Sequence, residues 1–124
     1  MIRILLVGAG GFFGSVLRYT LGGFVQRVFS ASLFPVGTLF VNVVGCLVIG
    51  LLAGMGDSRG ALGAPARLFL LIGLLGGFTT FSSFGYETIA LARQAEWLQA
   101  FGNVGLNVIV GLLAVWAGFA LGRQ

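Results

Sequence analysis

The segment that decides the fold is GGFTTFSSFGYE, residues 76–87, which interrupts a stretch otherwise rich in Leu, Ile and Phe. A helix that crosses a membrane is normally an unbroken apolar run. Here two glycines precede four hydroxyl residues, Thr79, Thr80, Ser82 and Ser83. Glycine relaxes the backbone, and hydroxyls can bond to main-chain groups released from a helix. The pattern predicts a helix that breaks at membrane depth, which is tolerated only inside protein or beside a water-filled cavity.

The composition of the whole chain is typical of a protein that lies in a lipid bilayer. Of its 124 residues, 58% are hydrophobic and 8% are charged, and the mean hydropathy is +1.08. Soluble domains carry about 25% charged residues, so this chain could not cover a soluble surface. We therefore expect an all-α membrane protein.

The residues that carry most enzyme chemistry are scarce. The chain has no His, one Cys (Cys46) and three acidic residues. This excludes an internal disulfide and removes the commonest general base and metal ligand. The seven basic residues are scattered arginines that form no basic stripe. We expect neither an enzyme nor a nucleic-acid partner.

The charged residues and turn signals divide a single transmembrane domain, residues 1–124, into four expected helices. The uncharged segment 37–56 has the length needed to cross about 30 Å of hydrocarbon, and Pro65 marks the turn that follows it. The expected spans are residues 4–25, 37–56, 68–91 and 97–122.

The arginines are nearly balanced between the two sides of the membrane. Four spans place both termini on one side, with Arg3, Arg59, Arg67 and Arg123, whereas Arg27 and Arg93 lie opposite. The positive-inside rule acts on this small difference. Either the termini face the cytoplasm, or the chain inserts in both orientations, which would permit an antiparallel dimer.

Glycine pairs with the small-xxx-small spacing occur in every expected span. Such pairs allow close helix contacts in lipid, and they predict packing within one chain. Their number also suggests a helix-packed homo-oligomer. The pairs are Gly10 and Gly14, Gly50 and Gly54, Gly73 and Gly77, and Gly118 and Gly122.

Polar residues recur at helical spacing in the second and fourth spans. Thr38 and Asn42 share one helix face, as do Asn103 and Asn107. Both pairs are expected to project inward, either as interhelical hydrogen bonds worth about 0.6–2 kcal/mol each or as the lining of a conduit. Arg18 and Glu87 are the ionisable residues well inside the spans, and such residues are functional candidates by default. Structural anchoring or mutual pairing explains them equally well.

The phenylalanines of the opening segment, Phe78, Phe81 and Phe84, recur every three residues. Such a stripe is more often core packing than a binding site, but here it lies beside the expected break and the hydroxyls. Neutral donors and the positive edges of phenyl rings suit a small, hard anion. A conduit of this kind lacks the acidic ring that ordinary cation channels use.

Four segments resemble the signature segments of the Fluc (CrcB-type) fluoride channels, in the same order and spacing over nearly the whole chain. They are GGFFGSVLRY (10–19), GTLFVNVVG (37–45), GLLGGFTTFSSF (73–84) and NVGLNVIVG (103–111). The resemblance implies an antiparallel, dual-topology homodimer in a prokaryotic cell membrane, with the third helix broken at mid-membrane. It implies two pores through which fluoride leaves the cytoplasm passively, which lowers its toxicity.

The resemblance also assigns site residues. Backbone carbonyls of Gly76 and Thr79 would hold a structural Na⁺ at the dimer interface. Ser83, Gly85 and Asn103 depart from the residues usual in the family. Arg18 and Glu87 would be pore-end or structural charges. The fluoride pore would be lined by Phe81, Phe84, Asn42, Thr38, Ser82, Ser83, Asn107 and Asn103.

Two other classes of function are weighed against this one. A small dual-topology multidrug exporter needs a carboxylate in its first span, and this first span has none. A non-transporting membrane scaffold would explain the glycine pairs but not the interrupted third span.

Overall fold

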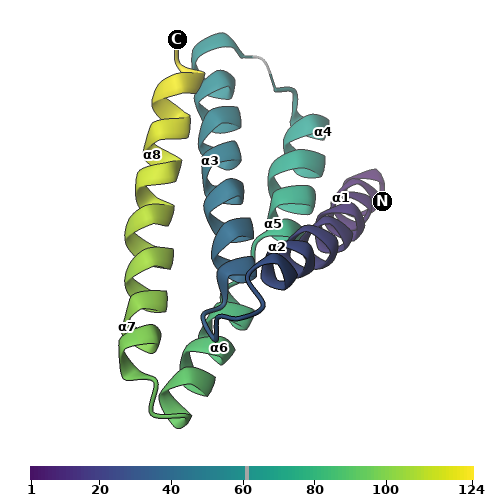
Figure 1. Cartoon of the computed structure of the whole chain (residues 1–124). Coiled ribbons are helices and arrows are strands. Elements are labelled where there is room, and N and C mark those ends of the chain that lie inside the picture. The colour runs from purple at the N-terminus through teal and green to yellow at the C-terminus, as the bar shows by residue number, and fades with distance from the viewer. Residues whose placement is uncertain (61) are drawn as a thin grey trace.

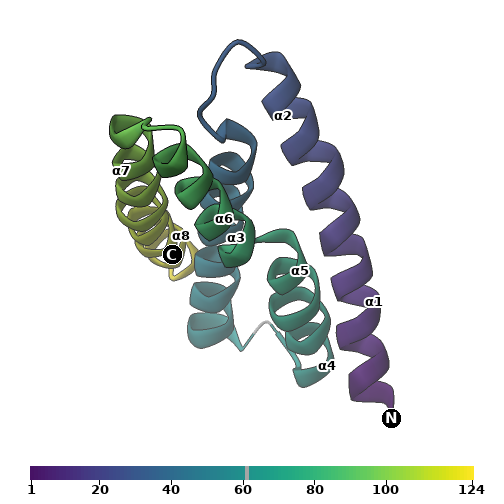
Figure 2. The same ribbon diagram turned by 90° about the horizontal axis from the view of Figure 1, so that it is seen from below.

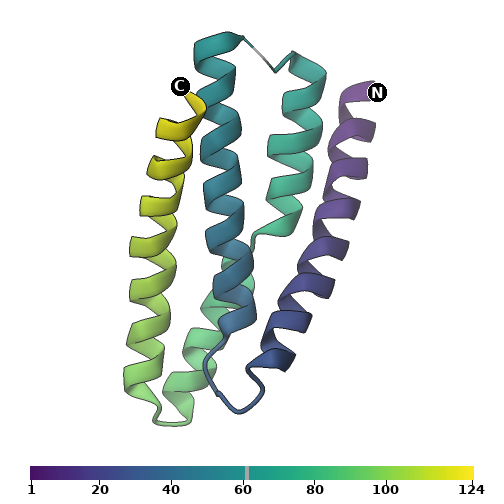
Figure 3. The same ribbon diagram turned by 45° about the horizontal axis from the view of Figure 1, so that its top comes forward.

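The fold consists of four long helical rods joined by short connections, in a computed structural model that describes residues 1–60 and 62–124. Each rod is long and apolar enough to cross a membrane: Ile2–Val28, Val36–Ser58, Ala64–Arg93 and Trp97–Gly122. The rods alternate in direction (Figure 1), and both chain ends lie at the same end of the bundle (Figure 3). The expectation of an all-α chain with four apolar helices is confirmed.

Three of the rods contain wider, π-helical segments. The first rod is α1 (Ile2–Leu17), η1 (Arg18–Gly22) and α2 (Gly23–Val28), and the second is α3 (Val36–Arg59). The third is α4 (Ala64–Arg67), η2 (Leu68–Leu75), α5 (Gly76–Phe78) and α6 (Phe81–Arg93). The fourth is α7 (Trp97–Gly105), η3 (Leu106–Val110) and α8 (Gly111–Gly122).

The third rod is interrupted between α5 and α6. Thr79 and Thr80 have extended backbones, with φ/ψ of −86°/160° and −151°/121°. The interruption is visible in Figure 3 as the thin link between the upper and lower parts of this rod. It separates the ring of Phe78, which is buried on α5, from Phe81 and Phe84 on α6. The three phenylalanines therefore do not form one continuous helical stripe.

Glycines bring the rods together in two seams. In the first, α3 packs along α8 (Figure 2), and Gly50 and Gly54 lie against the main chain near Gly118 and Gly122. A Cβ atom on Gly50 would collide with the carbonyl oxygen of Val115. These small residues allow the two backbones to touch, as is common between helices in lipid.

The second seam joins α1 to η2 and α5. Gly10 and Gly14 lie against the main chain of residues 69–78, and Gly73 and Gly77 lie against the main chain of α1. All four glycine pairs are thus used within one chain. The pairs predict the internal packing correctly, but they no longer argue for a homo-oligomer.

The connection between α2 and α3 is fixed by a side chain. Gln26 accepts a hydrogen bond from the N–H of Gly37 (3.0 Å) and donates one to the carbonyl of Phe34 (3.2 Å). The N–H of Gly37 is one of the first amides of α3, which have no partner within their own helix. Gln26 therefore fixes where α3 begins.

Candidate functional site

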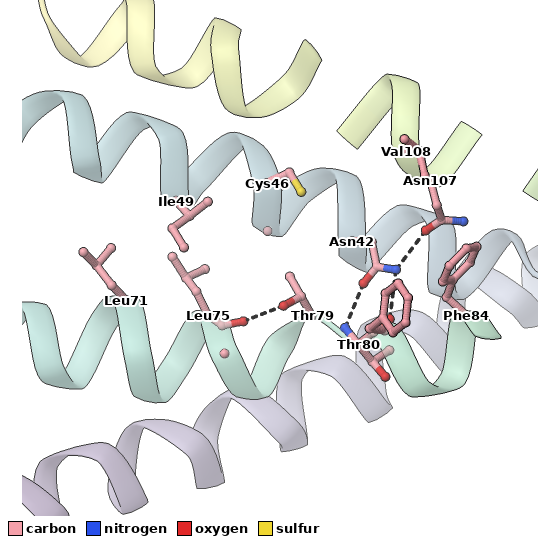
Figure 4. Close-up of a pocket in the computed structure, with 13 residues that line it drawn as sticks. Asn42, Cys46, Ile49, Leu71, Leu75, Thr79, Thr80, Phe84, Asn107 and Val108 are labelled. Carbon is pink, nitrogen blue, oxygen red and sulfur yellow. Dashed lines mark hydrogen bonds between the residues drawn. The ribbon is translucent and has the colours of Figure 1, made fainter. Parts of the chain in front are cut away.

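The interruption in the third rod is held by Asn42 on α3. The side-chain oxygen of Asn42 accepts from the N–H of Thr80 (2.8 Å), and its amide nitrogen donates to the carbonyl of the same residue (3.1 Å). Figure 4 shows the Asn42 side chain lying between Thr80 and Asn107. One carboxamide thus satisfies both main-chain groups that leave the helix at Thr80.

This arrangement releases two carbonyls from helical hydrogen bonding. In a continuous helix the N–H of Thr80 would donate to the carbonyl of Gly76, and that of Ser83 to the carbonyl of Thr79. Here Thr80 donates to Asn42, and the N–H of Ser83 donates to the hydroxyl of Thr80 (3.1 Å), which caps α6. Gly76 is exposed on the surface of the single chain. The carbonyls of Gly76 and Thr79 thus lose their helical partners.

The two expected polar stripes meet at this point. Asn42 donates to the side-chain oxygen of Asn107 on η3 (2.8 Å), and Asn107 donates to the side-chain oxygen of Asn103 (2.9 Å) and to its carbonyl (3.0 Å). Interhelical hydrogen bonding, one of the two interpretations of these stripes, is therefore present. Both N–H groups of the Asn42 amide already have acceptors.

The two phenylalanines on α6 differ in exposure. Phe81 is 83% exposed in the single chain, whereas Phe84 is 8% exposed. Their ring centroids are 5.4 Å apart with an interplanar angle of 60°, an edge-type contact. Both rings line a pocket of about 330 Å³, together with Gly76, Asn42 and Asn107. The two phenyl rings and the interrupted main chain at Thr79 and Thr80 therefore border the same space.

The hydroxyl group of Thr80 lies close to two other hydroxyl groups, those of Ser82 and Ser83. Thr80 Oγ1 donates to Ser83 Oγ (3.1 Å) and lies 3.3 Å from Ser82 Oγ. Thr80 and Ser83 also line a second pocket of about 500 Å³ between the first rod, α3 and α6. Of the described residues, Thr80 alone lines both pockets.

The second pocket is lined by Arg18 and Glu87, two ionisable residues that lie within the helices long enough to span a membrane. Thr38 also lines this pocket. Thr38 donates to Glu87 Oε1 (2.7 Å), while Glu87 Oε2 is buried and has no hydrogen-bond partner among the described residues. Arg18 and Glu87 thus share a pocket, but the partner of the carboxylate is Thr38. The alternative of direct pairing between Arg18 and Glu87 is not seen.

The candidate residues therefore divide into three groups. Gly76, Thr79, Phe81, Phe84, Asn42 and Asn107 line the first pocket, and Thr38, Ser83, Arg18 and Glu87 line the second. Ser82 is exposed beside Thr80, and Asn103 is fully buried behind Asn107. The sequence reasoning missed the central role of Thr80. A Thr directly before a helix is a common N-cap signal and could have indicated it.

Comparison with known proteins gives a match over most of the chain. A protein-family model described as "CrcB-like protein, Camphor Resistance (CrcB)" matches residues 5–119. A "Fluoride-specific ion channel FluC" of Methylobacillus flagellatus is 44% identical over 121 residues, which cover 98% of this chain and 94% of the relative. The protein of the same name from Chloroflexus aurantiacus is 45% identical over 123 residues, covering 99% and 97%. That of Maridesulfovibrio salexigens is 41% identical over 123 residues, again covering 99% and 97%.

Proposed function

The chain belongs to the CrcB-like family, and we infer from this that it is a fluoride-specific ion channel and not an enzyme. The single observation that carries this function is its similarity, over nearly the full length of both chains, to relatives named for fluoride conduction. The extended, non-helical main chain at Thr79 and Thr80 supports it, because it lines one pocket together with two phenyl rings and the Asn42 carboxamide.

The pore residues follow from this function and from the two pockets. Fluoride would exchange its hydration shell for neutral donors and ring edges, driven only by its gradient out of the cytoplasm of a prokaryotic cell. Because both N–H groups of Asn42 already have acceptors, an anion must compete with Thr80 or Asn107 for them. Arg18 and Glu87 would act at the pore end. The lining would consist of Phe81, Phe84, Asn42, Thr38, Ser82, Ser83 and Asn107, with Asn103 supporting it from behind Asn107.

We further propose that two chains of opposite orientation form the working channel. Three observations support this antiparallel, dual-topology homodimer. Phe81 is largely exposed in the single chain, the first pocket opens beside it, and the arginines are nearly balanced between the two ends. A second copy would cover this face and place the break of the third rod at mid-membrane in both chains.

A structural Na⁺ at the interface between the two copies is part of the proposal. No group of three or more His, Cys, Asp or Glu that could hold a metal occurs among residues 1–60 and 62–124. Carbonyls of unwound helices are known ligands for Na⁺, and those of Gly76 and Thr79 have lost their helical partners. These carbonyls would bind the ion and so hold the two copies together. Replacing Na⁺ by choline should then lower the thermal midpoint of the purified dimer.

The direct test of function is ion release from liposomes that contain the purified protein. We expect rapid fluoride release, measured with a fluoride electrode, and negligible chloride release in parallel. A multidrug exporter would need a proton gradient, and a scaffold would release neither ion. Absence of fluoride release from folded, dimeric protein would contradict the proposed function.

The pore assignment has its own test. Phe81→Ile removes a ring edge, and Asn42→Asp replaces the amide donor with a carboxylate of nearly the same shape. Both variants should abolish fluoride release while remaining dimeric by size-exclusion chromatography. Normal release by both variants would overturn the assignment.

A further inference from the structure

The chain has three asparagines, and all three lie in one continuous line of hydrogen bonds. The line begins at the N–H of Thr80 and passes through Asn42, Asn107 and Asn103. Asn103 then donates to the hydroxyl of Thr88 (2.9 Å), which donates to the carbonyl of Phe84 (2.8 Å). The line thus leaves the main chain of the third rod, crosses the second and fourth rods and returns to the third rod.

The direction of every bond in this line is fixed from both ends. A main-chain N–H can only donate, so Thr80 must face the oxygen of the Asn42 amide. A main-chain carbonyl can only accept, so Thr88 must donate to Phe84 and accept from Asn103. Both ends require the same orientation of all three amides. A line of aligned bonds also strengthens each of its members.

Asn103 does not lie where a pore residue would lie. Its side chain is 0% exposed, and it is not among the described residues that line either pocket. Thr88 likewise contacts Asn103 and its own helix and lines neither described pocket. Both residues therefore reach the proposed pore only through Asn107 and Asn42.

We propose that Asn103 and Thr88 are positioning residues that fix the orientation of the Asn107 amide, and hence the acceptor that holds one of the two Asn42 N–H groups in the proposed pore. The proposal rests on the proposed function for its transport consequence. When Thr88 cannot accept, the Asn103 amide loses its buried acceptor and can turn. Asn107 then keeps only the carbonyl of Asn103 as a fixed acceptor. The Asn42 N–H that faces Asn107 loses its fixed acceptor, while Thr80 still holds the other side of the Asn42 amide.

The orientation of the asparagine amides can be tested without measuring ion transport. Protein labelled with ¹⁵N-asparagine gives three side-chain amide pairs, one for each asparagine. Thr88→Val keeps the shape of the side chain and removes its hydroxyl. We expect hydrogen exchange of the Asn103 and Asn42 amide protons to rise roughly tenfold, because buried hydrogen bonds are lost. Thr88→Ser, which retains the hydroxyl, should restore slow exchange. Unchanged exchange at Asn42 in Thr88→Val would overturn the proposal.

Thr20 provides a matched control for Thr88. It donates to the carbonyl four residues before it, Val16 (2.9 Å), as Thr88 donates to Phe84, but it lies on the exposed side of η1. Thr20→Val should leave the exchange of all three asparagine amides unchanged. If amide exchange rose equally in Thr20→Val and Thr88→Val, the cause would be a general loosening of the fold. That result would also overturn the proposal.

The transport arm uses Asn107→Ala, which cuts the line between Asn103 and Asn42. In the otherwise unchanged protein, Thr88→Val should slow fluoride release roughly fivefold, because the donors at Asn42 are no longer held in place. In the Asn107→Ala background the same change should alter the rate less than about twofold, because no connection remains to be lost. Equal slowing in both backgrounds would overturn the proposal. A wild-type protein that releases no fluoride would instead overturn the proposed function, and the exchange arm would still report on the line.

Discussion

Asn42 and Gln26 use the same chemistry at two places in the molecule. Each carboxamide accepts from one main-chain N–H and donates to one main-chain carbonyl. Asn42 holds both groups of a single residue, Thr80, where the third rod is interrupted. Gln26 holds Gly37 and Phe34, where the chain enters α3. A side chain thus takes the place of main-chain bonding in both regions.

The difference lies in what surrounds each amide. Gln26 lies at the end of the bundle, near the exposed residues of the connection 29–33, where water can take over its bonds. Asn42, on α3, lies between α6 and η3, and its side chain is hydrogen-bonded to that of Asn107. Its bonds also release the carbonyl of Gly76 from the helix. The same device therefore shapes a connection in one place and builds a candidate ion site in the other.

The largest expected effect is that of Asn42→Leu. The change leaves the N–H and carbonyl of Thr80 and the side-chain oxygen of Asn107 without their partner. Buried groups left in this state cost about 1–3 kcal/mol each. We expect the free energy of unfolding in detergent micelles to fall by roughly 3 kcal/mol or more. A fall below about 1 kcal/mol would mean that the interruption does not depend on Asn42.

A smaller effect is expected of Thr80→Val. The change removes the hydroxyl that caps α6, and losing such a cap costs about 0.5–2 kcal/mol. It also frees the N–H of Ser83 to bond to the carbonyl of Thr79, one of the two proposed Na⁺ ligands. The stabilisation of the dimer by Na⁺ over choline should therefore shrink. Thr80→Ser retains the hydroxyl and should behave like wild type; a defect of equal size in Thr80→Ser would contradict the capping role.

Gln26→Leu should have a milder effect than either change at the interruption. The variant removes two part-buried hydrogen bonds, and water can replace part of what is lost. We expect the free energy of unfolding to fall by about 1 kcal/mol. Fluoride release should fall less than in Asn42→Leu, because Gln26 lines the second pocket but holds no group at the interruption. A fall as large as that of Asn42→Leu would show that the two amides do not differ as described.

The smallest effect is expected at the turn between α6 and α7, which has no carboxamide of this kind. Main-chain bonds close this turn, including Glu96 N–H to the carbonyl of Leu91 (3.0 Å). Ala95 has a φ of 61°, in the left-handed region that favours glycine. Ala95→Gly should raise the free energy of unfolding by roughly 0.5 kcal/mol and leave fluoride release unchanged. A loss of stability would mean that this turn is not strained.

Much of this architecture could be predicted from local sequence patterns. Apolar runs between charges indicated four helices, and the four-residue spacing of Asn103 and Asn107 placed both on one face, where they bond to each other. The glycine spacing indicated close packing. It could not say that Gly50 meets α8 and not another copy, because one surface of small residues fits either partner.

The parts that could not be predicted depend on contacts between distant segments. Thr38 was expected on the same face as Asn42, but its bond to Glu87 depends on how α3 meets α6. The burial of Asn103 depends on Thr88 lying opposite it. The π-helical segments η1, η2 and η3 had no signal in the sequence that we recognised. Local spacing fixes which residues share a face, whereas the packing of the rods decides what that face meets.

The most direct test of the central claim compares fluoride release by Asn42→Leu and Gln26→Leu proteins in liposomes, at equal amounts of folded dimer. If the carboxamide at the interruption builds the fluoride path, Asn42→Leu should release fluoride at less than about a hundredth of the wild-type rate. Gln26→Leu, whose side chain lines the second pocket but holds no group at the interruption, should keep a much higher rate. Comparable release by the two variants would contradict the assignment of the fluoride path to the interruption at Thr79 and Thr80.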